Sequence, residues 1–255
     1  MEKRKNNSIW RELWRRLIHN KRAVFAMIIL SILLLIVIFA DVIVPYSKAV
    51  DQSIMERFTK PGAAHWFGTD KYGRDQFART IHGTRISLLI GFGSTTIAAV
   101  FGTLIGISAA YFGGKVDNII MRILDIWMAM PSLLVTLAII AGLGVGIPQT
   151  IFALAFGATP GFARTLRAAA LGVASQEFIE SSVAQGASHW RIMRHDMVPN
   201  VISQILIQFT MNVSYMILLG STLSFLGLGA QPPTPEWGAM LAEGLQDYQL
   251  LLHQM

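Results

Sequence analysis

The chain has 255 residues and a formal net charge of +6, with 53% hydrophobic and only 14% charged residues. A soluble globular domain carries roughly a quarter charged residues, so this composition indicates a membrane protein. The sequence contains no cysteine, which excludes disulfides, zinc–thiolate sites and iron–sulfur clusters. The basic residues gather beside an apolar block, which favours a membrane flank, and no nucleic-acid partner is expected.

The first 22 residues hold eight Lys or Arg residues and are expected to form a cytoplasmic amphipathic segment. Apolar side chains recur at helical spacing in this segment. Trp and Arg are typical of a helix that lies on the membrane lipid surface. The apolar residues are Ile9, Trp10, Leu13, Trp14 and Leu17.

Five apolar stretches follow, and they predict an all-α, polytopic membrane helix bundle. About 20 residues at 1.5 Å each cross the hydrocarbon core. Pro131 is expected to kink the third span and Pro160 interrupts the fourth. Gly102-x-x-x-Gly106 in the second span permits a close helix approach. The predicted spans are 23–44, 86–111, 119–143, 149–171 and 201–228.

Lys and Arg counts predict the orientation. With a cytoplasmic N-terminus, the inner segments hold 14 basic residues and the outer loop 45–85 holds 7. Cytoplasmic segments carry the excess of Lys and Arg, so the N-terminus is expected inside.

A long polar connection between the last two predicted spans covers residues 172–199. Residues 176–185 are expected to form a short helix that ends at a left-handed Gly186. Ser188 is expected to cap a second helix, and Pro199 suits the first turn of the last span. Most loops in compact folds are far shorter, at about 4–6 residues. A docking role for a soluble partner is therefore expected, with an ordinary interhelical loop as the alternative.

The spacing of Glu180, two small residues, Gly186 and Pro199 resembles the EAA loop of ABC-importer permeases. Serines replace the two alanines of the family pattern, and Asp196 replaces an apolar residue. The resemblance implies that this loop is a coupling helix seated in a cleft of an ATP-hydrolysing subunit. The implied coupling residues are Glu180, Ser181, Ser182, Gly186, Ala187, Trp190, Arg191 and Pro199.

A second stretch, Phe67-Gly-Thr-Asp-x-x-Gly-Arg-Asp75, resembles the signature of C-type dipeptide and oligopeptide permeases, which nickel and glutathione relatives share. The resemblance continues through Tyr111-Phe-Gly-Gly114 and Ser224-Phe-Leu-Gly-Leu-Gly229 to Glu236 and Trp237. Carboxylates and an arginine in a Gly-rich loop favour a turn of salt bridges and caps over a metal or catalytic cluster. The expected entrance loop, near an extracytoplasmic binding protein, comprises Gly68, Thr69, Asp70, Gly73, Arg74 and Asp75.

The resemblance implies a type I ABC importer (MetI-like) transmembrane fold and a non-catalytic permease for di- or oligopeptides or related solutes. Expected partners are a second, B-type permease, two ATP-binding subunits and an extracytoplasmic solute-binding protein, in a bacterial or archaeal cytoplasmic membrane. The chain has no Gly-rich Lys-Ser/Thr motif, so ATP and Mg²⁺ are expected only on the ATPase subunits. The expected domains are 1–22, the first span 23–44, the extracytoplasmic loop 45–84, the core permease domain 85–244 with coupling loop 172–199, and an atypical tail 245–255.

Ionisable and sulfur-containing residues near the spans have modest expected roles. Asp125 is expected to pair with Arg122, three residues away on one helical face, with a proton relay as the alternative. Arg164 and Arg167 are expected to be interfacial anchors or contacts to the loop. Two histidines, His189 and His195, are expected to be surface residues. Three methionines are expected to serve packing: Met121, Met128 and Met130.

Two alternative functions stay open. Family members continue past Glu243 and Gly244 into a sixth span that residues 245–255 lack, so a truncated, non-transporting fragment is one alternative. A secondary transporter or channel is the other. It would be indicated by ionisable residues in mid-span or by repeated halves with broken helices, and the sequence shows no clear repeat.

Overall fold

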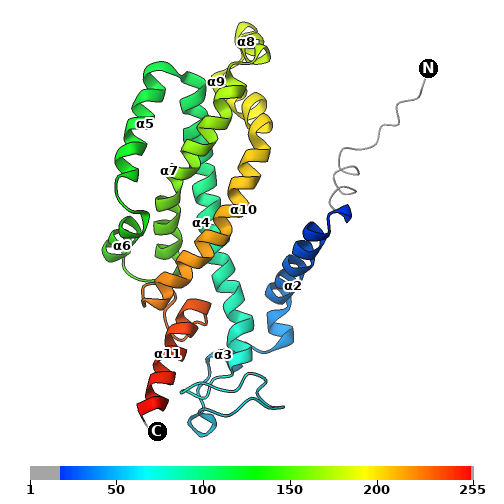
Figure 1. Ribbon diagram of the computed structural model, residues 1–255, viewed down its shortest axis with the longest axis vertical. Helices are drawn as coiled ribbons and strands as arrows, with labels where there is room; N and C mark the ends of the chain where they lie inside the picture. Colours follow the sequence, from blue (N-terminus) through cyan, green and yellow to red (C-terminus); the bar gives the residue numbers. More distant parts are fainter. Residues whose placement is uncertain (1–17, 254–255) are drawn as a thin grey trace, which may run out of the picture. The chain divides into compact units, whose positions relative to one another are not determined.

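The computed structural model describes residues 18–253, and every element of regular structure in that range is a helix. The predicted amphipathic segment lies almost wholly outside the described residues. Figure 1 shows the helices in chain order. They are α2 (Lys21–Ile43), α3 (Ser47–Val50), η1 (Ile54–Glu56), α4 (Gln76–Phe112), α5 (Gly114–Met128), α6 (Ser132–Leu143), α7 (Ile147–Ala174), α8 (Glu177–Ala184), α9 (His189–Arg191), η2 (Ile192–Met197), α10 (Val198–Phe225) and α11 (Trp237–His253).

The chain divides into two compact units, residues 1–84 and 85–255, with the boundary inside α4. In the first unit, Asn20 caps α2 by accepting hydrogen bonds from the N–H groups of Arg22 and Ala23 at 3.1 and 3.4 Å. A small apolar cluster joins the end of α2 to α3 and the start of α4. Its buried members are Ala40, Val44, Ala49, Ala78 and Ile81.

In the second unit, α4 packs against α7 at backbone distance. A Cβ atom on Gly102 would lie 2.3 Å from the Cβ of Phe162. A Cβ on Gly106 would lie 2.4 Å from the carbonyl oxygen of Ala163. Only glycine permits such an approach, so the predicted close contact at Gly102-x-x-x-Gly106 is confirmed.

The apolar helices confirm a protein with several spans. By length and composition alone, the described residues contain three or four helical segments able to cross a membrane, and the predicted number of five stays a prediction. Lys21–Ile43, Gln76–Phe112 and His189–Phe225 are long and apolar enough, and a bent pair formed by α5 and α6 raises the count to four. The fourth predicted span is helix α7, which does not meet the same criterion. Its buried face is rich in Ala and Thr, and it carries Arg164 and Arg167. The buried face of α7 packs through small residues, which allow neighbouring helices to approach closely.

The third predicted span is broken rather than kinked. Helix α5 ends at Met128, α6 begins at Ser132, and their axes differ by 80°. Pro131 has an extended backbone (φ −54°, ψ 129°) in front of α6. Proline lacks an N–H group and restricts the residue before it, so the helix stops there and restarts in a new direction.

The buried carboxylate of Glu236 attaches α11 to the rest of the second unit. Oε1 of Glu236 accepts hydrogen bonds from the hydroxyls of Ser87 and Ser221 at 2.8 and 3.1 Å. Oε2 accepts the N–H groups of Gly238 and Ala239 at 2.8 and 3.0 Å, which caps α11. Glu236 thus connects α4, α10 and α11. Residues 245–253, expected as a separate tail, continue this same helix.

Replacing Glu236 with Ala is expected to destabilise the protein. The change removes a helix cap, about 1 kcal/mol, and leaves buried donors without an acceptor, about 1–3 kcal/mol. Scanning fluorimetry of the detergent-purified protein should show a melting temperature lower by several degrees. Glu177→Ala, which truncates an exposed glutamate, is the control, and equal melting temperatures for the two variants would contradict the assignment.

Candidate functional site

The first half of the predicted docking loop is the short helix α8, closed by a glycine turn. The N–H of Gly186 bonds the carbonyl of Val183 at 2.9 Å, and the N–H of Ala187 bonds the carbonyl of Ser182 at 3.1 Å. These two bonds are those of a Schellman motif, which needs a left-handed residue. Gly186 has φ +76°, so the predicted left-handed glycine is confirmed.

The second half of the loop is not the separate short helix that the sequence predicts. Ser188 does cap α9, since its Oγ accepts the N–H of Arg191 at 3.4 Å. Helix α9 then runs through η2 into α10 without a break. Segment η2 is a π-helical turn, in which the N–H of Val198 bonds the carbonyl of Met193. In a regular α-helix, the ring of Pro199 would clash with the carbonyl group four residues before it. The wider π-helical turn before Pro199 relieves this clash.

Side chains from α4 hold the start of α9. The hydroxyl of Tyr111 lies 2.8 Å from Nδ1 of His189, and the rings of Tyr111 and Phe112 lie 5.5 and 5.4 Å from the imidazole. His189 is exposed, as expected for a surface residue, yet it has a polar partner 78 positions away. Sequence spacing contains no signal for such a contact.

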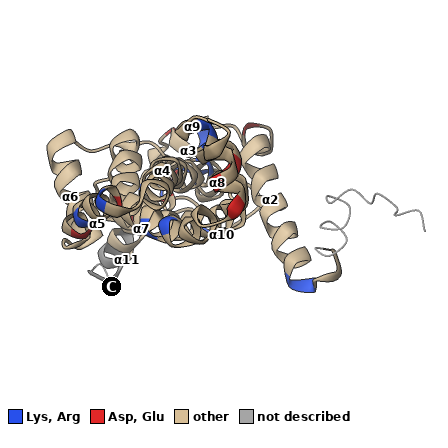
Figure 2. Ribbon diagram, turned by 90° about the horizontal axis from the view of Figure 1, so that it is seen from above, with Lys and Arg blue, Asp and Glu red and all other residues tan. Residues whose placement is uncertain are grey.

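Buried apolar side chains attach the loop to the helix bundle, while its other side chains are exposed. Ile179, Ile192 and Met197 are buried and join one apolar cluster with residues of α4 and α7. Glu180 and Ser181 are exposed, and Trp190 is 55% exposed. Figure 1 shows α8 at one end of the helix bundle, and Figure 2 looks down on that end with acidic segments red and basic segments blue.

Most of the expected coupling residues are exposed. Glu180, Ser181, Gly186, Trp190, Arg191 and Pro199 are exposed, and Ser182 and Ala187 are half-buried. The hydroxyl of Ser181 accepts the Nε2 group of Gln185 at 3.1 Å. The remaining surface can meet a second protein without disturbing the buried anchor.

Two ion pairs attach α5 to α7 and correct the expected pairing. Nη2 of Arg164 lies 2.5 Å from Oδ1 of Asp125, so Asp125 pairs across helices rather than with Arg122. The Nε and Nη2 groups of Arg167 donate to the two carboxylate oxygens of Asp117, both at 2.5 Å. Both arginines therefore hold helices together, and neither is only an interfacial anchor.

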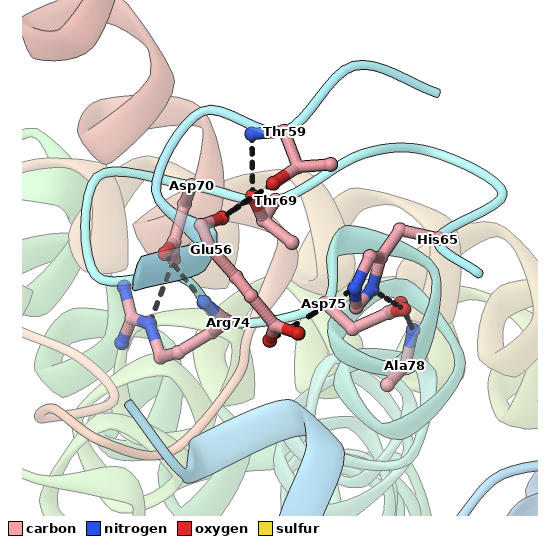
Figure 3. A network of polar contacts seen from close by, with 8 residues as sticks. All are labelled: Glu56, Thr59, His65, Thr69, Asp70, Arg74, Asp75 and Ala78. Carbon is pink, nitrogen blue, oxygen red and sulfur yellow. Dashed lines mark hydrogen bonds and ion pairs between the residues drawn. The ribbon is translucent and has the colours of Figure 1, made fainter. Parts of the chain in front are cut away.

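The entrance loop of the first unit is organised by the buried Asp70 (Figure 3). Its carboxylate accepts Nε of Arg74 and Nη1 of Arg79, both at 2.7 Å. It also accepts the N–H groups of Tyr72 and Arg74 at 2.8 and 3.0 Å. Gly73 has φ +75°, and a Cβ there would lie 1.9 Å from the carbonyl oxygen of Ser53. This is the expected turn of salt bridges and caps.

The other entrance-loop residues fasten the same turn. One oxygen of Asp75 caps α4 by accepting the N–H of Ala78 at 2.8 Å, and the other lies 2.8 Å from Nδ1 of His65. The hydroxyl of Thr69 accepts the N–H of Thr59 at 2.8 Å and donates to the carbonyl of Glu56. Gly68 also has a positive φ, +72°. His65, ten residues before Asp75, is a member of this network that sequence reasoning missed.

The acidic side chains of this loop accept hydrogen bonds that hold the turn together. Within residues 18–253, no group of three or more His, Asp or Glu side chains is arranged to hold a metal ion. The carboxylates of Asp70 and Asp75 accept hydrogen bonds from fixed partners of the turn (Figure 3).

Asp70→Asn is expected to loosen the entrance loop. Removing one member of a buried ion pair costs about 3–5 kcal/mol, because the remaining charge stays buried. Limited trypsin digestion should cleave after Arg57 and Lys71 faster than in the wild type. Asp51→Asn changes an exposed carboxylate in the same way and should leave the cleavage rate unchanged. Equal digestion of both variants would disprove the organising role of Asp70.

Comparisons with known proteins assign the family. Residues 102–252 match the family described as binding-protein-dependent transport system inner membrane component. Residues 8–61 match the N-terminal TM domain of oligopeptide transport permease C. The chain is 41% identical over 242 residues to the dipeptide transport system permease protein DppC of Alkalihalophilus pseudofirmus, covering 95% of this chain and 79% of the relative.

A second relative and a solved structure lead to the same assignment. Identity to the glutathione transport system permease protein GsiD of Pectobacterium atrosepticum is 40% over 245 residues, covering 96% of this chain and 81% of the relative. A solved inward-facing structure of the MetNI methionine ABC transporter (native crystal form) aligns with a TM-score of 0.52 at 20% identity, covering 68% of this chain and 88% of that chain. The expected MetI-like fold is thereby confirmed, and the chain belongs to the family of binding-protein-dependent transport system inner membrane components, the permease subunits of ABC importers.

Proposed function

We propose that this permease couples ATP hydrolysis on a soluble partner to the import of a di- or oligopeptide or a related small solute. The proposal for the solute rests on relatives named for dipeptide and glutathione transport. Its location is the bacterial or archaeal cytoplasmic membrane, with the N-terminus inside. The chain itself performs no chemistry.

The observation that carries the coupling role is an exposed helix on a buried anchor. Helix α8 presents Glu180 and Ser181 outward, while Ile179 on its other face is 4% exposed and packs in the core. A partner that binds α8 and moves it also moves the buried side chains of the loop, because the Schellman turn at Gly186 connects the two halves of the loop. The displacement reaches α4 through Tyr111 and His189, and α10 through the continuous η2 segment.

The assembly needs parts that this chain lacks. Two ATP-binding subunits hold ATP and Mg²⁺, and each receives one coupling loop, from this chain and from a second, B-type permease. An extracytoplasmic solute-binding protein delivers cargo near the entrance loop. ATP favours the closed state of the ATPases, and this differential affinity shifts the permease between its two states.

Glu180→Lys tests the docking assignment. The variant is expected to insert and assemble normally, while solute-stimulated ATP hydrolysis and uptake in reconstituted vesicles fall at least about tenfold, the equivalent of 1.4 kcal/mol. Asp51→Lys reverses another exposed carboxylate and should preserve both activities. Full coupling in Glu180→Lys would show that α8 does not enter the ATPase cleft at this residue.

Gly186→Pro tests the turn between the two halves. Proline requires φ near −65° and has no N–H, so it cannot keep φ +76° or the bond to Val183. Uptake should be abolished while membrane insertion persists. Gly186→Asn is the matched control, because asparagine tolerates the left-handed region, and it should retain most of the uptake. Normal transport by the proline variant would refute the role of the turn.

A further inference from the structure

An almost wholly apolar pocket of about 200 Å³ lies where α4 meets the segment formed by α9, η2 and the start of α10. It is close to the docking loop, at the end of the bundle that the proposed function places at the cytoplasmic surface. The lining residues are Leu104, Ile107, Ser108, Trp190, Met193, Arg194 and Val198. Leu104 lies eight residues before Phe112, the last residue of α4, which is about 12 Å at 1.5 Å per residue. The pocket therefore lies at the depth of the lipid headgroups and the first part of the acyl chains.

A second apolar pocket, of about 360 Å³, adjoins the first on the α5 side of α4. Leu104 and Ser108, which are four residues apart on one face of α4, line both pockets. The other residues that line the second pocket are Ile105, Ile120, Ile123, Leu124 and Trp127. Leu104 is 40% exposed and Ile123 is 56% exposed. The two pockets therefore form the lobes of one open, apolar groove, the α4 groove.

One cation and one indole ring line the first lobe beside the docking loop. Arg194 is exposed, and its guanidinium has no hydrogen-bond or ion-pair partner within residues 18–253. Arg164 and Arg167 on α7, in contrast, each contact a carboxylate. Trp190 has the apolar ring and the polar N–H group that are typical of side chains at a membrane–water interface. Among the described residues, no carboxylate lines either lobe, so the charge of Arg194 is not neutralised within the groove.

We propose that the α4 groove binds an anionic phospholipid of the cytoplasmic leaflet, with its acyl chains in the two lobes and its phosphate at Arg194. The choice of leaflet rests on the orientation given in the proposed function. A guanidinium donates paired, charge-assisted hydrogen bonds to a phosphate group. Basic pockets between membrane helices on the cytoplasmic side are typical sites for anionic headgroups.

A phospholipid fits this groove better than a helix of another subunit does. A helix would have to bring an acceptor to Arg194 at the edge of the membrane, whereas every anionic phospholipid carries a phosphate at that depth. The two lobes lie on either side of Ser108, whose hydroxyl contacts Sδ of Met193 at 3.7 Å. A bound phospholipid would therefore contact α5, α4 and η2 together and stabilise the attachment of the docking loop to α4.

Removing the charge is the first test. The full chain, purified in detergent, is titrated with phosphatidylglycerol or with phosphatidylcholine, and native mass spectrometry counts the bound lipid. The wild type should bind phosphatidylglycerol at least about tenfold more tightly than phosphatidylcholine, and Arg194→Gln should lose this preference. Arg122→Gln removes another exposed arginine, which lies outside the groove, and should keep the preference. Equal preferences in the two variants would overturn the assignment.

Mapping the lipid is the second test, and it needs no variant. Phosphatidylglycerol with a photoreactive acyl chain is irradiated in vesicles that hold the complete transporter, and label should concentrate in residues 104–108, 120–127 and 190–198. Label spread evenly over the apolar helices would mean annular lipid only. A groove labelled in the isolated chain but not in the complete transporter would mean that another subunit covers it. Either result would overturn the lipid site, while the proposed function stands or falls on its own uptake test.

Discussion

The structure of the second unit depends on the close approach of α4 to its neighbours. Besides its contacts with α7, Gly91 lies where a Cβ would be 2.3 Å from Cγ1 of Ile217, and Gly220 lies where a Cβ would be 2.5 Å from Cγ2 of Ile90. Lipid provides no hydrophobic drive between helices, so tight packing through glycine replaces it. A methyl group at any of these glycines would push α4 away from α7 or α10. The segments attached to these helices would then be displaced as well.

Within each unit, a buried carboxylate connects separate segments of the chain. Asp70 gathers the entrance loop of the first unit, and Glu236 fixes α11 in the second. A buried charge is costly unless several donors satisfy it, so each carboxylate accepts at least four hydrogen bonds. The same requirement makes both sites specific, because few other arrangements of the chain provide these donors.

The proposed transport role rests on an exposed helix with a buried anchor. Helix α8 is exposed but fastened, through His189 and the π-helical segment η2, to α4 and α10. Helix α10 also lines a half-open cavity of about 340 Å³ with Asn212 and Tyr215. In the proposed role, a movement of α9 would pass into α10, because α9, η2 and α10 form one continuous helix.

The sequence by itself determined the features that depend on neighbouring residues. Apolar blocks predicted most of the helices, Gly186 and Ser188 the turn and the cap, and the 67–75 signature the entrance turn and the family. Only the tertiary structure decided which distant groups meet. Asp125 pairs with Arg164 instead of its near neighbour Arg122, and α7 buries one face rich in small residues within the bundle. Caps and turns are set by a few adjacent residues, whereas cross-helix partners follow from how the glycine contacts bring the helices together.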